Sequence, residues 1–189
     1  ANSIKNIIIA TSKNEDDNET CELCNKLNIE FFRGDLKNVA SRFYEIIMIH
    51  QAEKFMRINA DSPLIDPSLI DQFVNYYDLG LNDIITNVLK RSFPKGQSIE
   101  IFNSKIFIDG YNKFSNYDQK ENVTKYFYEN NLNYKILNIE NKLSYSDINL
   151  SVDTLEDLKK LRQIYKFNKN INWLSYTLKY KKLFNEKKT

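Results

Sequence analysis

The apolar positions of this chain form two patterns, short continuous runs and helical spacings, which alternate along its first half. The run Ile7-Ile8-Ile9 is typical of a strand buried on both faces of a parallel sheet. Between Val39 and Ile49 the apolar residues recur instead along one helix face. These patterns predict strands over residues 5–11, 29–32, 55–60, 83–88, 99–102, 134–139 and 149–152. They predict helices over residues 16–27, 38–51, 67–77, 118–130, 155–165 and 171–186.

The order of these elements predicts the fold class. Strands and helices alternate at the start, which indicates a mainly parallel, Rossmann-like sheet with helices on both faces, a three-layer α/β/α arrangement. No linker, repeat or low-complexity block interrupts residues 1–189, so we expect a single domain. The last helix, about 171–186, has an apolar side that must pack on this domain or on a second subunit. Its lysines are more typical of a solvated helix face than of a surface for anions or lipid.

Composition and charge exclude several classes of protein. Lys and Arg number 27 and Asp and Glu 25, and the net charge of +2 is too near balance to predict nucleic-acid binding. No apolar run reaches the ~18 residues of a membrane span, and the start of the chain does not resemble a signal peptide, so we expect a cytoplasmic protein. The sequence contains no GxGxxG and no GxxxxGK(S/T), which excludes the dinucleotide fingerprint and the P-loop.

The two cysteines and the single histidine offer little chemistry. Cys21 and Cys24 form a CxxC, which suits a redox pair or half of a zinc site. A zinc site needs a second pair of ligands, and only His50 remains. We therefore interpret the cysteines as ordinary thiols on a helix face, and His50 as a structural or surface residue.

Two aspartates stand where predicted strands end. In open α/β sheets the ligand crevice lies at the carboxyl ends of the strands. Asp61 follows the strand 55–60 and Asp153 follows the strand 149–152. Two carboxylates from distant strands are suitable ligands for Mg²⁺, which also takes waters and substrate phosphates. The alternative is that both aspartates cap helices, and Asp153 followed by Thr154 fits that alternative well. Spacing alone does not choose between them.

Several longer segments carry motifs that occur together, in order, over about residues 5–165. They are RGDLKNVASRFYE at 33–45, ADSPLIDP at 60–67, FPKGQSIEIF at 93–102, ENVTKY at 121–126 and VDTLEDL at 152–158. As a set they resemble the cytidylyltransferase family that activates acidic sugars, and within it the branch of the spore-coat polysaccharide biosynthesis proteins of the SpsF type. The resemblance implies the nucleotide-diphospho-sugar transferase fold.

The resemblance also implies an activity and its partners. It implies a Mg²⁺-dependent nucleotidyltransferase that activates a sugar or sugar acid for surface glycans and releases pyrophosphate, with CTP as the favoured nucleoside triphosphate. It places the catalytic Mg²⁺ on Asp61 and Asp153, the pair that the strand ends select independently. Related enzymes are usually dimers, so we expect a homodimer. The aromatic segment 105–130 is a candidate contact surface, and an intramolecular core role is an equal alternative.

Further residues are expected to bind substrate. Arg33 and Arg42 offer bidentate donors to a phosphate or a carboxylate, although an ion pair with Glu45 would equally explain Arg42. Four residues are expected to line the sugar pocket, with Glu100 binding hydroxyl groups: Asn87, Arg91, Gln97 and Glu100. The full set of expected substrate-binding residues is Arg33, Arg42, Asn59, Asn87, Arg91, Gln97 and Glu100.

The chain departs from the family at its start. Family members open with a strand and a loop of the form A-R-x-x-S-x-R-L-P-x-K, which grips the triphosphate, and nothing similar occurs here. We therefore expect an N-terminally incomplete domain that lacks its first strand; the alternative is a diverged sequence that has lost nucleotide binding. Ala60 replaces a family glycine, and Asn122 replaces a family histidine. Two other functions stay open: guanylyl or other nucleotidyl transfer to a sugar 1-phosphate, and a non-catalytic module that binds a sugar or a partner.

Overall fold

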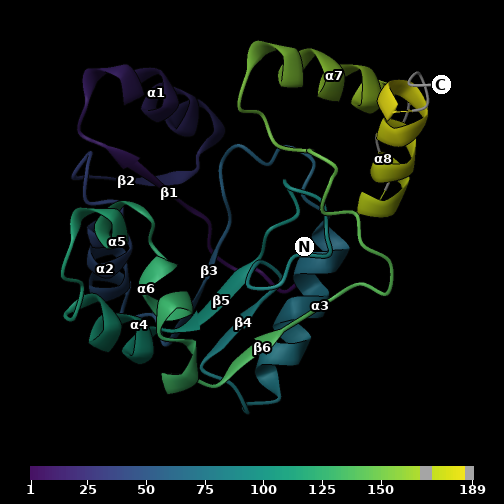
Figure 1. The fold of residues 1–189 in the computed structure, drawn as a ribbon. Helices are drawn as coiled ribbons and strands as arrows, with labels where there is room; N and C mark the ends of the chain where they lie inside the picture. Colours follow the sequence, from purple (N-terminus) through teal and green to yellow (C-terminus); the bar gives the residue numbers. More distant parts are fainter. Residues whose placement is uncertain (167–171, 186–189) are drawn as a thin grey trace. The chain divides into compact units, whose positions relative to one another are not determined.

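The computed structural model describes residues 1–166 and 172–185, and strands alternate with helices along it (Figure 1). The strands are β1 Ile8–Ser12, β2 Glu30–Gly34, β3 Lys54–Arg57, β4 Ile84–Thr86, β5 Glu100–Asn103 and β6 Ile136–Asn138. The helices are α1 Asn18–Leu27, α2 Val39–His50, α3 Pro67–Asp78, α4 Ser104–Tyr111, α5 Tyr117–Glu121, α6 Lys125–Glu129, α7 Leu155–Lys166 and α8 Trp173–Tyr180. Shorter helical turns are η1 Glu15–Asp17, η2 Asn131–Asn133 and η3 Lys181–Asn185. The predicted α/β class is confirmed.

The strands form a two-stranded sheet, β1-β2, and a four-stranded sheet in the order β3-β5-β4-β6. β1 and β2 are parallel, as are β4 and β6. β5 runs antiparallel to β3, as two contacts show. Arg57 at the end of β3 pairs with Glu100 at the start of β5. At the other end of the same two strands, Ser104 N–H donates to Glu53 C=O (3.0 Å). The sheet therefore has an antiparallel member among its parallel strands.

The chain forms two compact units that alternate in sequence. Unit 1 comprises Ala1–Ser3, Met56–Ile101 and Ile136–Thr189, and unit 2 comprises Ile4–Phe55 and Phe102–Lys135. Two of the four boundaries fall inside strands, one in β3 and one in β5, so no linker sequence marks those two. The expectation of a single domain over residues 1–189 stays a prediction.

In unit 1, α3 buries one face beside β4 (Figure 1). Asp66 begins the helix by accepting a hydrogen bond from Ser68 N–H (2.8 Å), and Pro67 suits its first turn because proline has no N–H to leave unpaired. Leu69 and Phe73, one turn apart, are buried against Ile85 of β4 and other apolar residues. Burying side chains of this size stabilises the fold by about 2 kcal/mol each.

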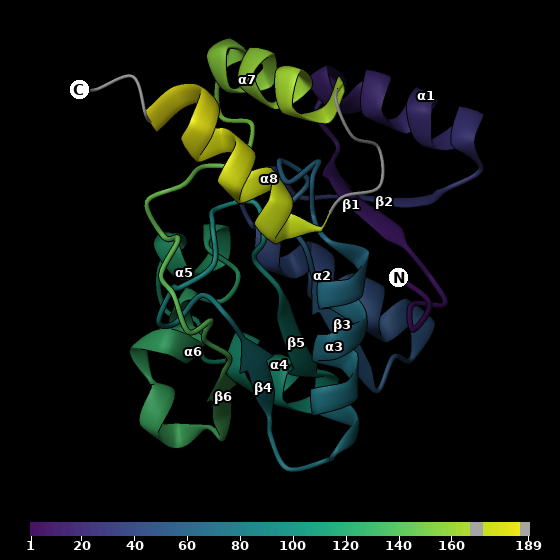
Figure 2. The ribbon, with the colours of Figure 1, turned by 90° about the vertical axis from the view of Figure 1, so that its right-hand side faces the viewer.

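A second core of unit 1 lies under α7 and α8, which pack side by side (Figure 2). It contains Leu161 and Ile164 of α7 together with Leu150. The strand predicted over residues 149–152 is wrong, since only an isolated bridge joins Asn149 to Lys95. The segment bonds two different partners in turn, with Leu150 N–H to Lys95 C=O and Val152 N–H to Asp61 C=O, so no continuous ladder forms.

The C-terminal helix is shorter than the predicted 171–186. α8 covers Trp173–Tyr180 and continues into the η3 turn, and its apolar side packs on the second core of unit 1. Residues 171 and 186 lie outside the described residues.

Unit 2 is built around aromatic side chains. Phe107 of α4 and Phe127 of α6 are fully buried, and their rings contact those of Phe55 and Phe102. The aromatic rings at the heart of segment 105–130 thus have an intramolecular core role. A homodimer stays a prediction.

Two helical features of unit 2 differ from the sequence prediction. The helix predicted over 118–130 is broken into α5 and α6, because Asn122 leaves the helical region and its side chain donates to the Asp118 carboxylate (2.6 Å). α4 was not predicted. Its signals are an N-cap, Asn103, and the apolar Phe107, but Gly110 interrupts the helical pattern.

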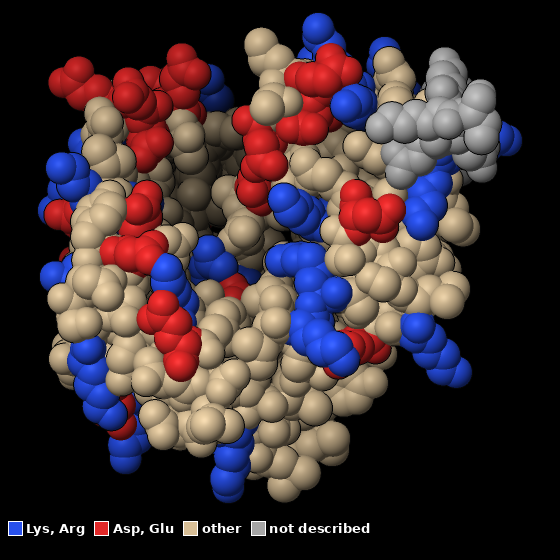
Figure 3. Space-filling view, viewed as in Figure 1, with Lys and Arg blue, Asp and Glu red and all other residues tan. Residues whose placement is uncertain are grey.

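Charged side chains on the surface follow the helix ends. Figure 3 shows acidic side chains over the start of α1 and over the start of α7. η1, just before α1, carries Glu15, Asp16 and Asp17, and the first turn of α7 carries Glu156 and Asp157. Carboxylates are stabilised there by the helix dipole, so no ligand is needed to explain them. Within the described ranges, no helix is long and apolar enough to cross a membrane.

A tight turn at Gly96 gives the first testable prediction. Gly96 has φ +86°, and an added Cβ would overlap the Leu150 carbonyl group and lie 2.9 Å from Ser151 N. Gly96→Ala should therefore lower the free energy of unfolding by about 3 kcal/mol, because it adds a backbone clash to the strain of a positive φ. Urea denaturation followed by circular dichroism measures the change.

Gly80 is the matched control. It also has a positive φ, +72°, but an added Cβ would meet no atom within 4 Å. Gly80→Ala should cost only about 1 kcal/mol, the strain alone. Equal losses at the two positions would contradict the close approach of Gly96 to the Leu150 segment.

Candidate functional site

Polar residues gather at one edge of the four-stranded sheet, in unit 1. Arg57 ends β3, Asn87 follows β4, and Glu100 begins β5. Because β5 is antiparallel, its start lies at the carboxyl ends of β3 and β4. Ile99 N–H accordingly donates to Asn87 Oδ1 (3.0 Å). This is the edge at which open α/β sheets place their ligands.

The loop that carries Asp61 is held by the side chain of Gln97. Gln97 is fully buried; its Nε2 donates to Leu64 C=O (2.7 Å), and its Oε1 accepts from Asp66 N–H (3.0 Å). A single amide thus pairs a donor and an acceptor of the loop, neither of which has a helix or strand partner of its own. The loop conformation after β3 therefore depends on Gln97.

Asn87 in turn holds Gln97. Its Nδ2 donates to Gln97 C=O (2.7 Å), while its Oδ1 accepts from Ile99 N–H (3.0 Å). Asn87 is also fully buried. Both residues were expected to bind substrate, and the structure gives their amide groups a positioning task on backbone groups. Direct contact of either side chain with a substrate stays a prediction.

Asp66 is a site residue that the sequence reasoning did not select. Its Oδ1 accepts from Ser68 N–H, and its Oδ2 accepts from Trp173 N–H (3.0 Å) at the start of α8. One buried carboxylate therefore joins the beginnings of α3 and α8 to the loop. The available signal was Asp66 directly before Pro67, a typical helix start.

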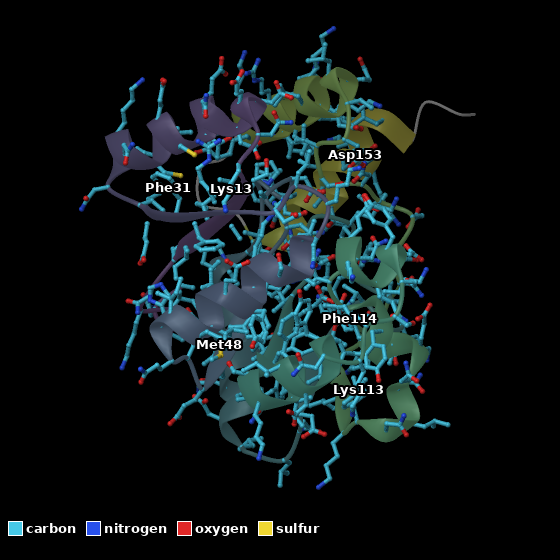
Figure 4. The ribbon with its side chains drawn as sticks, turned by 90° about the vertical axis from the view of Figure 1, so that its left-hand side faces the viewer. Lys13, Phe31, Met48, Lys113, Phe114 and Asp153 are labelled. Atoms are coloured by element: carbon cyan, nitrogen blue, oxygen red, sulfur yellow. The ribbon has the colours of Figure 1, made fainter. Side chains whose placement is uncertain are left out.

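The structure brings the segments of Asp61 and Asp153 together. Val152 N–H donates to the backbone carbonyl of Asp61 (2.8 Å), so the residue before Asp153 is bonded directly to Asp61. Asp61 is half-buried and accepts from Ser62 Oγ (2.9 Å). Asp153 is exposed on the segment that leads into α7 (Figure 4). Asp61 and the segment that carries Asp153 are thus neighbours in space.

Neither aspartate caps a helix. The α7 cap is Thr154, whose Oγ1 accepts from Asp157 N–H (3.2 Å), while the Asp157 carboxylate accepts from Thr154 N–H (2.9 Å). Hydrogen bonding by Thr154 lowers the pKa of Asp157. The N-cap of α3 is Asp66, not Asp61. The helix-cap alternative is therefore wrong for both residues.

The donor set at Asp61 and Asp153 fits Mg²⁺. The two carboxylates come from segments fixed by a backbone hydrogen bond, and both are accessible to solvent. Among the residues with described positions, no cluster of three or more His, Cys, Asp or Glu could hold a metal. A cation bound by this pair would complete its coordination shell with water and phosphate oxygens, as Mg²⁺ typically does in proteins. Metal binding by this pair stays a prediction.

Arg33 and Arg42, in unit 2, use their guanidinium groups internally. Arg33 donates from Nε to Ser12 C=O (2.8 Å), and its other two nitrogens bond to Asn14 C=O and Asn18 Oδ1. It thereby closes the loop after β1.

Arg42 is buried and donates to three backbone carbonyls, those of Ala10, Asp35 and Leu36. Burial lowers the pKa of Arg42, and the charges of Asp17 and Asp35 oppose that shift. The guanidinium bonds the backbone instead of forming the ion pair with Glu45 that was the alternative explanation. Phosphate or carboxylate binding by Arg33 or Arg42 stays a prediction.

The remaining predicted residues lie in unit 1. Arg91 donates to Ser98 Oγ (3.1 Å), and Asn59 is half-buried at the start of the Asp61 loop. Glu100 is buried and forms an ion pair with the half-buried Arg57. No observation assigns any of the three to a substrate, so their roles stay predictions.

The cysteines and the histidine match their plain interpretations. Cys21 and Cys24 are free, buried thiols on α1. His50 Nε2 lies 3.2 Å from a carboxylate oxygen of Glu30 in unit 2, and both side chains are partly exposed.

The two hydrogen bonds by which Gln97 holds the Asp61 loop, here called the Gln97 clamp, give a second prediction. Gln97→Met keeps the volume but leaves Leu64 C=O and Asp66 N–H without partners. Since a buried unpaired backbone group costs about 1–3 kcal/mol, the free energy of unfolding should fall by about 2–5 kcal/mol. Chemical denaturation measures this loss. The matched control is Gln163→Met on the exposed face of α7, where a change within about 0.5 kcal/mol is expected; a similarly small change at Gln97 would contradict the clamp.

A third prediction concerns Asp17. Hydrogen bonds from the Ser12 hydroxyl (2.5 Å) and Ser12 N–H (2.8 Å) lower its pKa below 3.8. The lowered pKa means that ionised Asp17 stabilises the fold above pH 3.8 and that this contribution is lost as the pH falls through the folded-state pKa. Ser12→Ala should raise the pKa of Asp17 toward 3.8 in an NMR titration, whereas Ser146→Ala should leave it unchanged. An unchanged pKa in Ser12→Ala would refute the assignment.

Comparison with known proteins identifies the family of this chain. The model of the cytidylyltransferase family matches residues 1–187. The chain is 32% identical over 171 residues to an uncharacterized protein of Methanocaldococcus jannaschii, across 89% of this chain and 69% of that protein. It is 29% identical over 164 residues to the spore coat polysaccharide biosynthesis protein SpsF of Bacillus subtilis, across 85% of this chain and 67% of that protein.

Solved structures share the fold. A cytidylyltransferase from Leptospira borgpetersenii superposes with a TM-score of 0.87 at 24% identity, across 93% of this chain and 75% of that one. The 4-diphosphocytidyl-2C-methyl-D-erythritol synthase of Anaerococcus prevotii gives a TM-score of 0.58 at 16% identity, across 86% and 82%. The family model spans nearly all of the chain, and the fold is that of a solved cytidylyltransferase. This protein is therefore a nucleotidyltransferase that belongs to the cytidylyltransferase family.

Proposed function

We propose that this protein is a Mg²⁺-dependent cytidylyltransferase that transfers the CMP part of CTP to a sugar or sugar acid for surface polysaccharide synthesis. The observation that carries the proposal is the hydrogen bond from Val152 N–H to Asp61 C=O, which sets Asp61 beside Asp153 while neither carboxylate caps a helix. The family supports the nucleotide, and the similarity to SpsF supports the sugar. We further propose that the enzyme acts in the cytoplasm as a homodimer.

In the proposed reaction an oxygen of the sugar attacks the α-phosphorus of the triphosphate. The bond from that oxygen to the α-phosphorus forms, the bond from the α-phosphorus to the bridging oxygen breaks, and pyrophosphate leaves; a proton from an attacking hydroxyl passes to solvent. Mg²⁺ held by Asp61 and Asp153 would neutralise phosphate charge. The contribution of Gln97 and Asn87 is to fix the Asp61 loop before substrate arrives, because catalysis of this kind depends on positioning and electrostatics.

Pyrophosphate release tests the proposal. The natural gene product should release pyrophosphate with CTP and a sugar or sugar acid in the presence of Mg²⁺. Asp61→Asn and Asp153→Asn should each lower kcat/KM by about a thousandfold, the equivalent of several kcal/mol of lost charge stabilisation. The matched control is Asp147→Asn, an exposed aspartate in unit 1, which should retain full activity.

The same assay separates the competing functions. Pyrophosphate release from another triphosphate would replace CTP as the proposed donor. Pyrophosphate release only with a sugar 1-phosphate would replace the free sugar or sugar acid as the proposed acceptor. No release from any pairing of four triphosphates with the candidate sugars would indicate a non-catalytic binding module. Full activity in Asp61→Asn and Asp153→Asn would remove these aspartates from the mechanism.

A further inference from the structure

Arg57 and Glu100 form an ion pair at the edge of the sheet that carries Asp61. Arg57 is the last residue of β3, and Glu100 is the first residue of the neighbouring strand β5. The pair joins Arg57 Nη1 to Glu100 Oε2. Asp61 lies on the loop that follows Arg57. The ion pair and the candidate metal pair thus belong to the same edge of unit 1.

The two partners differ sharply in burial. The Glu100 side chain is 2% exposed, whereas that of Arg57 is 23% exposed. A buried carboxylate is costly unless positive charge compensates it, and Arg57 offsets part of that cost for Glu100. Conversely, a fixed and buried carboxylate holds one end of the guanidinium in place, which restricts an otherwise flexible side chain.

The Arg57 guanidinium is used differently from those of Arg33 and Arg42. The latter two bond all three of their nitrogens to neighbouring carbonyl and amide oxygens. In the described part of the chain, Arg57 donates from Nη1 alone, to Glu100. Its Nε and Nη2 present two N–H groups in the parallel geometry that carboxylate and phosphate oxygens accept.

We propose that Arg57 is a specificity-determining residue, which binds the negatively charged group of the sugar substrate through Nε and Nη2, and that Glu100 is the positioning residue that orients it. The inference rests on the proposed function for the identity of the substrate. The charged group is the carboxylate of a sugar acid or the phosphate of a sugar phosphate. Glu100 acts through Arg57 in this account instead of binding sugar hydroxyls.

Equilibrium binding tests this role independently of turnover. Calorimetric titrations compare a 2-keto-3-deoxy sugar acid with its carboxamide, and a sugar 1-phosphate with the free sugar. The wild type should bind the charged member of one pair at least tenfold more tightly than the neutral member, and that pair identifies the source of the charge. Charge-assisted hydrogen bonds of this kind correspond to about 10- to 100-fold in affinity.

The double variant Arg57→Gln/Glu100→Gln removes both charges together, so no unpaired buried charge remains. It should fold, as checked by thermal unfolding, and should bind the charged and neutral members with similar affinity. Arg57→Lys keeps the compensating charge but loses the fork, so its preference should fall severalfold. The control Arg162→Gln, on the exposed face of α7, should keep the wild-type preference.

The outcomes separate the two proposals. A preference that survives in the folded double variant would make Arg57 a structural counter-charge only and would overturn the inference. If the double variant does not fold, an undiminished preference in folded Arg57→Lys overturns it equally. Failure of the wild type to bind any of the four probes would also overturn it. Binding that depends on Arg57 without pyrophosphate release would uphold the inference while refuting the proposed function.

Discussion

The arrangement of the candidate site depends on the two hydrogen bonds that the Gln97 amide makes to the loop after β3. Leu64 C=O and Asp66 N–H are inside the protein but outside any helix or strand ladder, and leaving such groups unpaired would cost about 1–3 kcal/mol each. Gln97 is itself held by Asn87. The loop it fixes presents Asp61 C=O to Val152 N–H, and this bond brings Asp153 alongside.

Sequence patterns were sufficient for the parts of this arrangement that are local. Asp61 and Asp153 were selected because each follows a predicted strand, and the start of α3 is explained by Asp66 and Pro67. The apolar alternation of residues 149–152 does not make a strand, because the segment bonds Lys95 and then Asp61. Which backbone groups will face a segment is decided by distant parts of the chain, and periodicity contains no information about them.

The arginines show a related limit. Residue type predicts that an arginine donates hydrogen bonds, but it does not predict to what. Arg42 donates its hydrogen bonds to backbone carbonyls. Arg57, which no sequence pattern selected, ends a strand at the edge where Asp61 and Glu100 lie. Asn87 and Gln97 were expected to line the sugar pocket, and the structure shows that their amides bind backbone groups at this edge. An edge of this kind combines a buried amide framework with a few accessible charges.

The proposed mechanism requires Asp61 and Asp153 to hold one divalent cation together. The most direct test is an anomalous difference map from crystals of the protein grown with Mn²⁺ and a non-hydrolysable analogue of CTP. We expect a peak about 2.0–2.2 Å from a carboxylate oxygen of each aspartate, with phosphate oxygens and waters completing the shell. A peak bound to other residues, or a bound triphosphate whose metal touches neither Asp61 nor Asp153, would contradict it.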